Sequence, residues 1–239
     1  MPARMKLDIS VIIPIYNGSQ FIDTTVRAYY DALQKDPYVG KFEIILVTNN
    51  CSDDSPQRAG KWAQKQKRIR HMDFPFKTLK GGAVIRGFEK SRYPFVGFTD
   101  VDMSTSPNEF VKLIPYLFEK HVGAVIASRK MPNSFLHPPQ SFLRQFLGDG
   151  FGLIRELLFG LGIKDSQCGA KIFRREAIVP LKLKTTGWAF DVELLYKVKR
   201  NGFVIKEIGI TWKDKPGSVL RLTDPFYMLK ELIRLRLRV

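Results

Sequence analysis

The chain has 239 residues, 44% of them hydrophobic, and 39 lysines and arginines against 23 aspartates and glutamates give a formal net charge of +16. This length and apolar content predict one domain with a large core. Two distant cysteines, Cys51 and Cys168, without metal-ligand spacing argue against a disulfide framework or a zinc site. No apolar run suits a membrane span or a signal peptide, so we expect a cytosolic protein. The excess positive charge predicts an anionic partner, which is nucleic acid, nucleotide phosphate or a membrane surface.

Short β-branched runs alternate with longer amphipathic segments through the first half of the chain. The runs predict strands over 9–16, 42–47, 69–74, 94–99 and 123–128. The segments between them predict helices over 19–34, 56–67, 80–91 and 107–120. This alternation is typical of an α/β fold, with a mostly parallel central sheet flanked by helices.

The alternation loosens after residue 130. Residues 129–140 hold three prolines and predict a loop, followed by helices over 141–159 and 190–202 and a strand over 203–212. The end of the chain, DPFYMLKELIRLRLRV (224–239), starts with a capping Asp and a first-turn Pro and mixes apolar with basic side chains. It predicts a basic amphipathic helix that either docks on the core or lies at an anionic membrane surface.

Two aspartates follow one of the predicted strands. In GFTDVDMST (97–105), Asp100 and Asp102 lie two residues apart, so on an extended chain both side chains face the same way. Two carboxylates in one crevice repel each other unless a divalent cation lies between them, and oxygen ligands suit Mg²⁺ or Mn²⁺. A single D-x-D is more often a solvated loop, so the decision rests on its neighbours.

The neighbouring strands also end in polar turns. IPIYNGSQFI (13–22) and EIILVTNNCSDDS (43–55) close the first two strands, and LKGGAVIRGF (79–88) opens a helix with a glycine pair beside Lys80 and Arg86. Ligands of open α/β sheets bind at the carboxyl ends of the strands, where helix N-termini point their N–H groups outward. The glycine turn is therefore a predicted phosphate site.

With these motifs the sequence resembles the family 2 glycosyltransferases, which have the GT-A fold and a D-x-D metal motif. More narrowly, it resembles the dolichyl-phosphate β-glucosyltransferases and related polyprenyl-phosphate hexose synthases. That resemblance rests on KGGAVIRGF, DSQCGAKIFRREA (165–177), WAFDVELLYKVK (188–199) and an IxWxxxPGSxL pattern at 210–220. It implies one GT-A catalytic domain over 1–223, with a donor half at about 8–128 and an acceptor half at 129–223, followed by the helix at 224–239.

The resemblance implies an inverting, metal-dependent transfer of a hexose, with glucose favoured, from a nucleotide diphosphate sugar, with UDP favoured, to polyprenyl or dolichyl phosphate. Catalysis would rest on Asp100, Asp102 and Asp191, with Mg²⁺ or Mn²⁺ held by Asp100, Asp102 and Gln167. The acceptor phosphate would bind Arg129 and Arg144. The donor would contact Pro14, Tyr16, Asn17, Asn49, Ser52, Lys80, Gly81, Arg86, Asp100 and Gln167. We then expect a peripheral protein at the cytoplasmic face of the membrane.

Some alternatives remain open. Thr48 and Asn49 stand where these enzymes usually carry an acidic pair, which leaves the nucleotide undecided. A phosphate monoester is already anionic and needs no general base, whereas a carbohydrate hydroxyl would need one, with Asp191 as the candidate. Asp191 and Glu193 lie two apart on a predicted helix, so at most one faces the site. A basic nucleic-acid-binding module rests on charge alone and lacks a recognition motif, so we expect no nucleic-acid partner.

Overall fold

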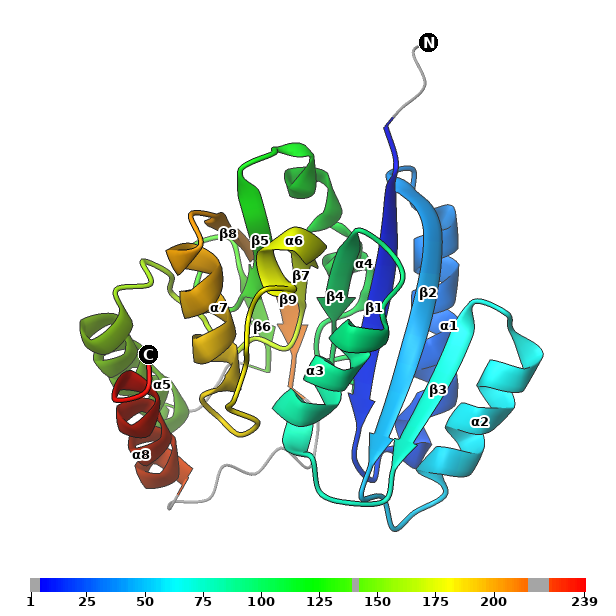
Figure 1. Cartoon of the computed structure of the whole chain (residues 1–239), viewed down its shortest axis with the longest axis horizontal. Coiled ribbons are helices and arrows are strands. Elements are labelled where there is room, and N and C mark those ends of the chain that lie inside the picture. Colours follow the sequence, from blue (N-terminus) through cyan, green and yellow to red (C-terminus); the bar gives the residue numbers. More distant parts are fainter. Residues whose placement is uncertain (1–4, 139–141, 215–223) are drawn as a thin grey trace.

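The computed structural model describes residues 5–138, 142–214 and 224–239, apart from the side chains at 143–144 and 224–225. Within these residues a seven-stranded sheet carries helices on both faces (Figure 1). Its strand order is β3-β2-β1-β4-β7-β5-β8, and β7 runs antiparallel to both of its neighbours. A small parallel sheet pairs β6 (Phe135–His137) with β9 (Thr211–Lys213).

The first half of the chain alternates strands and helices as predicted. Its elements are β1 (Leu7–Ile15), α1 (Ser19–Lys35), β2 (Val39–Asn49), α2 (Ser55–Lys65), β3 (Ile69–Phe74), α3 (Leu79–Lys90) and β4 (Phe95–Phe98). The strands β1 to β4 are parallel, because each is joined to the next through a helix that crosses back over the sheet. The expected α/β architecture with a mostly parallel sheet is confirmed.

The second half departs from the predictions at several points. Its elements are α4 (Pro107–Val111), the 3₁₀ segment η1 (Ile114–Phe118), β5 (Val122–Ser128), α5 (Phe142–Phe159), β7 (Lys171–Arg174), α6 (Arg175–Ile178), α7 (Phe190–Arg200), β8 (Val204–Gly209) and α8 (Asp224–Arg236). The single helix predicted over 107–120 is wrong, because Pro115 lacks an N–H group and the chain tightens into η1 there. The loop predicted over 129–140 contains β6.

The strand predicted over 203–212 is also wrong as one strand, since the chain changes sheets at Ile210. The Ile210 N–H donates to the Ser128 carbonyl, while the Ile210 carbonyl accepts from the Phe135 N–H. The segment before this residue therefore pairs with β5 as β8, and the segment after it pairs with β6 as β9.

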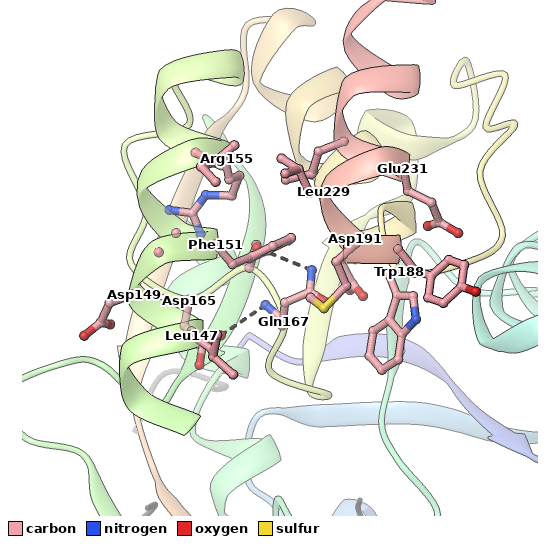
Figure 2. Close-up of a pocket in the computed structure, with 18 of the residues that line it drawn as sticks. Leu147, Asp149, Phe151, Arg155, Asp165, Gln167, Trp188, Asp191, Leu229 and Glu231 are labelled. Atoms are coloured by element: carbon pink, nitrogen blue, oxygen red, sulfur yellow. Dashed lines mark hydrogen bonds between the residues drawn. The ribbon is translucent and has the colours of Figure 1, made fainter. Parts of the chain in front are cut away.

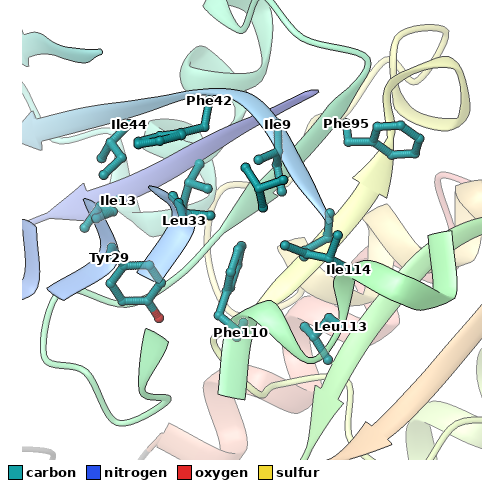
Figure 3. Close-up of a cluster of buried hydrophobic side chains, with 14 of the residues drawn as sticks. Ile9, Ile13, Tyr29, Leu33, Phe42, Ile44, Phe95, Phe110, Leu113 and Ile114 are labelled. Atoms are coloured by element: carbon teal, nitrogen blue, oxygen red, sulfur yellow. The ribbon is translucent and has the colours of Figure 1, made fainter. Parts of the chain in front are cut away.

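Alternate side chains of the central strands enter two cores, one on each face of the sheet. On β1, Ile9 and Ile13 join the cluster that also contains Tyr29 of α1 and Phe110 of α4 (Figure 3). Ile12 points to the other face, into a cluster that includes residues of α3, α7 and α8. This period of two explains why the buried strands read as continuous apolar runs.

The strand order reverses beside β1, which pairs with β2 on one side and with β4 on the other. Such a switch point leaves a crevice at the carboxyl ends of the strands. Among the described residues, non-glycine residues with positive φ gather in the turns after β1, β2, β3 and β4: Asn17, Asn50, Leu79 and Met103. Left-handed backbone at non-glycine residues carries strain that is commonest at functional sites, so these turns mark the candidate site.

Candidate active site

The acidic pair lies directly after β4 and beside the first turn of α3. Asp100 Oδ1 is 2.6 Å from Lys80 Nζ, and Asp102 Oδ1 accepts a 2.8 Å hydrogen bond from the Ser104 N–H. Burial by itself lowers the pKa of Lys80, but the carboxylates of Asp100 and Asp191 more than offset this and leave the pKa raised. Lys80 therefore stays a cation beside the carboxylates.

The glycine turn at the start of α3 packs closely against the N-terminus of α7. A Cβ atom at Gly81 would lie 2.6 Å from the ring of Phe190, so only glycine fits there. The Gly81 N–H donates to the Thr186 carbonyl at 3.0 Å. Further along α3, the guanidinium of Arg86 lies 5.0 Å from the centre of the Phe74 ring. In this structure the turn thus joins α3 to the loop before α7.

Half of the predicted donor residues lie at the ends of β1 and β2 or in the turns that follow these strands. Asn17 Oδ1 accepts from the Ser52 N–H at 2.7 Å, which ties the two turns together. Asn49 is buried, and its Nδ2 donates to the last carbonyl of β1 at 3.1 Å. Pro14 is buried within β1, whereas Tyr16 is exposed. These contacts shape the edge at which Tyr16 and Asn17 are exposed.

A carboxylate that was not predicted from the sequence, that of Asp73, lies on β3. Thr48 on β2 and Asp73 on β3 are register partners, and the Thr48 hydroxyl donates to Asp73 Oδ1 at 2.7 Å. Thr48 Oγ1 also lies 2.8 Å from His71 Nε2. Thr48 and Asn49 of β2 stand where the similar enzymes carry an acidic pair, and a carboxylate from β3 lies beside them. The position of Asp73 near the end of a predicted strand was the signal for it.

Arg129, at the end of β5, is held by a buried aspartate. Its Nε and one terminal nitrogen lie 2.7 and 2.9 Å from the two carboxylate oxygens of Asp165, which also accepts from the Arg129 N–H at 3.0 Å. Asp165 accepts further bonds from the N–H groups of Gln167 and Cys168. Burial alone raises the pKa of Asp165, but the Arg129 guanidinium outweighs it and holds that pKa well below its usual range.

Asp191, in the first turn of α7, forms a buried ion pair that the sequence did not predict. Lys171 Nζ lies 2.6 Å from Asp191 Oδ1 and donates to the Cys168 carbonyl at 2.6 Å. Lys171 is 0% exposed and Asp191 6% exposed. Glu193 turns away and accepts from the N–H groups of the loop before α7, so one of the two acidic residues of this helix faces the site.

A cavity of about 1200 Å³ is lined by several of these side chains. Its polar end is lined by Lys80, Arg129, Asp165, Gln167 and Asp191, and its walls are α5 and α8. Figure 2 shows Gln167 and Asp191 between Leu147 and Phe151 of α5 and Leu229 of α8. The cavity therefore runs from charged groups at the sheet to a space between two helices, where apolar side chains lie together with Asp149, Arg155 and Glu231. The side chain of Arg144, on α5, lies outside the described residues.

The site can be tested for its fit to a divalent cation by its donor set. Asp100 and Asp102 supply carboxylate oxygens at one strand end, and Gln167 lines the adjoining cavity. Within the described ranges, no group of three or more His, Cys, Asp and Glu side chains surrounds a common point. Mg²⁺ and similar ions commonly bind through one or two carboxylates with substrate phosphates completing the shell. The residues present fit a cation that arrives with a diphosphate.

Comparison with known proteins identifies the family. The model of "Glycosyl transferase family 2" matches residues 10–179. The chain belongs to glycosyltransferase family 2. This family 2 glycosyltransferase is 34% identical to the dolichyl-phosphate beta-glucosyltransferase of Dictyostelium discoideum, over 96% of the chain and 74% of the relative. It is 29% identical to the glycosyltransferase AglD of Haloferax volcanii, over 95% of the chain, but it spans 37% of that longer protein.

A solved structure with the same fold is the glucosyl-3-phosphoglycerate synthase of Mycobacterium tuberculosis in complex with Mn²⁺, uridine diphosphate and glucosyl-3-phosphoglycerate. The TM-score is 0.69 at 20% identity, covering 97% of the chain and 79% of the synthase. The expected GT-A fold of this glycosyltransferase is therefore confirmed.

Proposed function

We propose that this glycosyltransferase moves a hexose, with glucose favoured, from a UDP-sugar to a polyprenyl phosphate with inversion at the anomeric carbon. The observation that carries the proposal is the cavity whose cationic end adjoins Asp100 and whose walls on α5 and α8 include apolar side chains such as Phe151 and Leu229. A lipid phosphate has the same two parts, an anionic head and an apolar chain. The names of the relatives, which include dolichyl-phosphate beta-glucosyltransferases, support this choice.

We propose that the acidic pair Asp100 and Asp102 binds the metal ion together with the diphosphate of the donor. Bound to Asp100 and Asp102, Mg²⁺ or Mn²⁺ would neutralise the charge that grows on the leaving diphosphate. Lys80 adds a second positive charge at the same place, since its Nζ lies 2.6 Å from Asp100. The synthase with Mn²⁺ and uridine diphosphate supports a divalent ion and a uridine nucleotide. We propose that Asn49 and Asp73 hold the nucleobase at the ends of β2 and β3.

The acceptor side favours a phosphate over a hydroxyl. We propose that Arg129 and Arg144 bind the acceptor phosphate, because Arg129 lines the cavity and is fixed in place by Asp165. A phosphate is anionic at neutral pH, so positioning by cations suffices and no general base is required. Asp191 Oδ1 is already engaged by Lys171, which suits a contact to the hexose better than a role as base.

The test is transfer of labelled sugar into an organic phase. Purified protein is incubated with a polyprenyl phosphate, Mn²⁺ or Mg²⁺, and separate labelled donors: UDP-glucose, UDP-galactose, UDP-N-acetylglucosamine and GDP-mannose. We expect label from UDP-glucose and background from GDP-mannose. Label from GDP-mannose alone would overturn the assignment of the donor, and no label from any donor would contradict the lipid-phosphate acceptor.

We further propose that the protein is peripheral, at the cytoplasmic face of the membrane, through α5 and α8. In the described part of the chain, no helix has the length and hydropathy needed to cross a bilayer. Instead, four apolar side chains on one face of α5 are exposed: Phe142, Phe146, Leu153 and Leu157. On α8, Leu232 and Leu235 are buried in the core while Phe226 and Ile233 are exposed beside basic residues. Apolar and cationic side chains together suit an anionic lipid surface.

Replacing Leu153 and Leu157 together with glutamate should weaken partition into anionic vesicles by roughly 10²-fold, because burying each leucine contributes about 1.5 kcal/mol or more. These residues are 64% and 78% exposed, so folding should be unaffected. Flotation with phosphatidylserine vesicles measures the bound fraction. The matched control is Val179→Glu, an equally exposed apolar residue after α6, away from α5 and α8 (Figure 1). Equal binding of the double variant, the control and the native protein would contradict the proposal.

A further inference from the structure

The turn that precedes Asp191 is held from two sides. On one side, the Thr186 carbonyl accepts from the Gly81 N–H of α3 at 3.0 Å. On the other side, Glu231 of α8 reaches the turn, and its Oε2 accepts from the Ala189 N–H at 2.9 Å. Ala189 is the residue before the first turn of α7, where N–H groups lack partners within the helix. Glu231 therefore acts as a helix cap supplied by a different helix.

The fit of Glu231 depends on a glycine opposite it. A Cβ atom at Gly187 would lie 2.4 Å from Glu231 Oε1 and 2.8 Å from Oε2, closer than real contacts allow. The carboxylate thus occupies the space that a side chain at position 187 would fill. A side chain at position 187 would push the Glu231 carboxylate aside, so a change at either residue disturbs the same contact.

The contact links the C-terminal helix to the catalytic end of the cavity. Glu231, Trp188 and Asp191 line one cavity, and Asp191 follows Ala189 by two residues (Figure 2). α8 itself is anchored next to Glu231, because the side chains of Leu232 and Leu235 are buried in the core that contains Phe190 and Val192 of α7. A shift of α8 would consequently be passed to the start of α7 through both apolar packing and the Glu231 carboxylate.

We propose that Glu231 is a positioning residue through which the C-terminal helix holds the Gly187–Asp191 turn in its productive geometry. The inference rests on the proposed function, in which Asp191 contacts the transferred hexose and α8 lies at the membrane. It makes the C-terminal helix part of the catalytic apparatus as well as a membrane contact. Binding of α8 to a lipid surface is then coupled, through the contact of Glu231 with the turn, to order at the hexose end of the cavity.

The first test compares Glu231→Ala, Gly187→Ala and Glu231→Gln with the native protein in the transfer assay. Small misplacements near reacting groups cost large factors, so the alanine variants at both positions should lower kcat about tenfold. The KM for the donor should change by less than about twofold, because the nucleotide end is untouched. Glu231→Gln keeps an oxygen that accepts from the Ala189 N–H and should retain most of the rate. Glu89→Ala, an exposed residue on α3, is the control.

The double variant Glu231→Ala with Gly187→Ala separates positioning from general damage. Both changes remove one contact, so the double variant should be no slower than the slower single variant. Additive losses, an unchanged kcat in Glu231→Ala, or a glutamine variant as slow as the alanine variant would each overturn the proposal. Thermal unfolding shows whether each variant is folded at the assay temperature.

Hydrogen–deuterium exchange tests the contact without substrate. The peptide that covers residues 186–193 should exchange faster in Glu231→Ala and in Gly187→Ala than in Glu89→Ala and the native protein. Unchanged exchange there overturns the inference. An inactive native protein would contradict the proposed function, while the exchange measurement would still decide whether Glu231 holds the turn.

Discussion

Replacing Asp100 with asparagine should lower kcat for hexose transfer by about 10²–10³-fold, the loss expected when one electrostatic group at the reacting centre is removed. Asp100 follows β4, and its carboxylate lies 2.6 Å from Lys80 Nζ. Its negative charge would therefore attract the proposed metal ion and also balance the charge of Lys80. Asparagine preserves the shape of the side chain but halves the carboxylate charge of the D-x-D pair. Asp102→Asn should show a loss of the same order.

The metal dependence of the variants is the more specific readout. Initial rates measured over a range of Mn²⁺ concentrations should show that Asp100→Asn and Asp102→Asn need more Mn²⁺ for half-maximal rate than the native protein. Asp31→Asn, an exposed aspartate on α1, should behave as the native protein does. A native rate that survives a chelator, or an Asp100→Asn rate within a few-fold of native, would contradict a metal role for the pair.

Removing Lys171 should have the largest effect on stability. Lys171→Met should reduce the free energy of unfolding by about 3–5 kcal/mol, because it leaves the 6% exposed carboxylate of Asp191 without its buried partner. Asp191→Leu should cost a similar amount by leaving the fully buried ammonium group of Lys171 unpaired. Urea unfolding followed by circular dichroism measures both.

The double variant Lys171→Met with Asp191→Leu tests whether the pair is the cause. Replacing both charges with apolar groups removes the unpaired charge, so the double variant should be more stable than either single variant. The control Arg58→Met breaks exposed pairs with Asp23 and Asp54 and should cost far less than either single variant. Losses below about 1 kcal/mol for both single variants would contradict the buried ion pair.

This pair also changes how a mutation at Asp191 must be read. A loss of activity in Asp191→Asn would fit a missing general base, a missing hexose contact, or a weakened bond to Lys171. Asparagine still offers an oxygen to the ammonium group, so its effect on stability should be smaller than that of leucine. The unfolding free energy of each variant is therefore needed beside its rate.

The sequence predicted the elements whose signal is local. The apolar runs of β1 to β5 fall within a few residues of their predicted positions, because buried parallel strands are apolar on both faces. β7 was not predicted, since it is four residues long and begins with Lys171, a charge whose buried partner lies 20 residues further on. The change of sheets at Ile210 likewise depends on strands that come from other parts of the chain.

The same distinction holds at the site. Asp100, Asp102 and Lys80 were predicted from two short motifs, and the structure brings Asp100 and Lys80 into contact. The contacts of Asp191 with Lys171 and of Ala189 with Glu231 join residues that are 20 and 42 positions apart, so no local sequence pattern predicts them. The carboxylate of Asp73 was overlooked for a similar reason, because its contact with Thr48 exists only through strand pairing.

The most direct measurement is the choice of acceptor. Purified protein is given labelled UDP-glucose and Mn²⁺ with either a polyprenyl phosphate or the polyprenol of the same chain length, with and without chelator. We predict organic-phase label with the phosphate alone, and its loss when the metal is removed. Equal label with the polyprenol, or label that persists in chelator, would contradict metal-dependent transfer to a lipid phosphate.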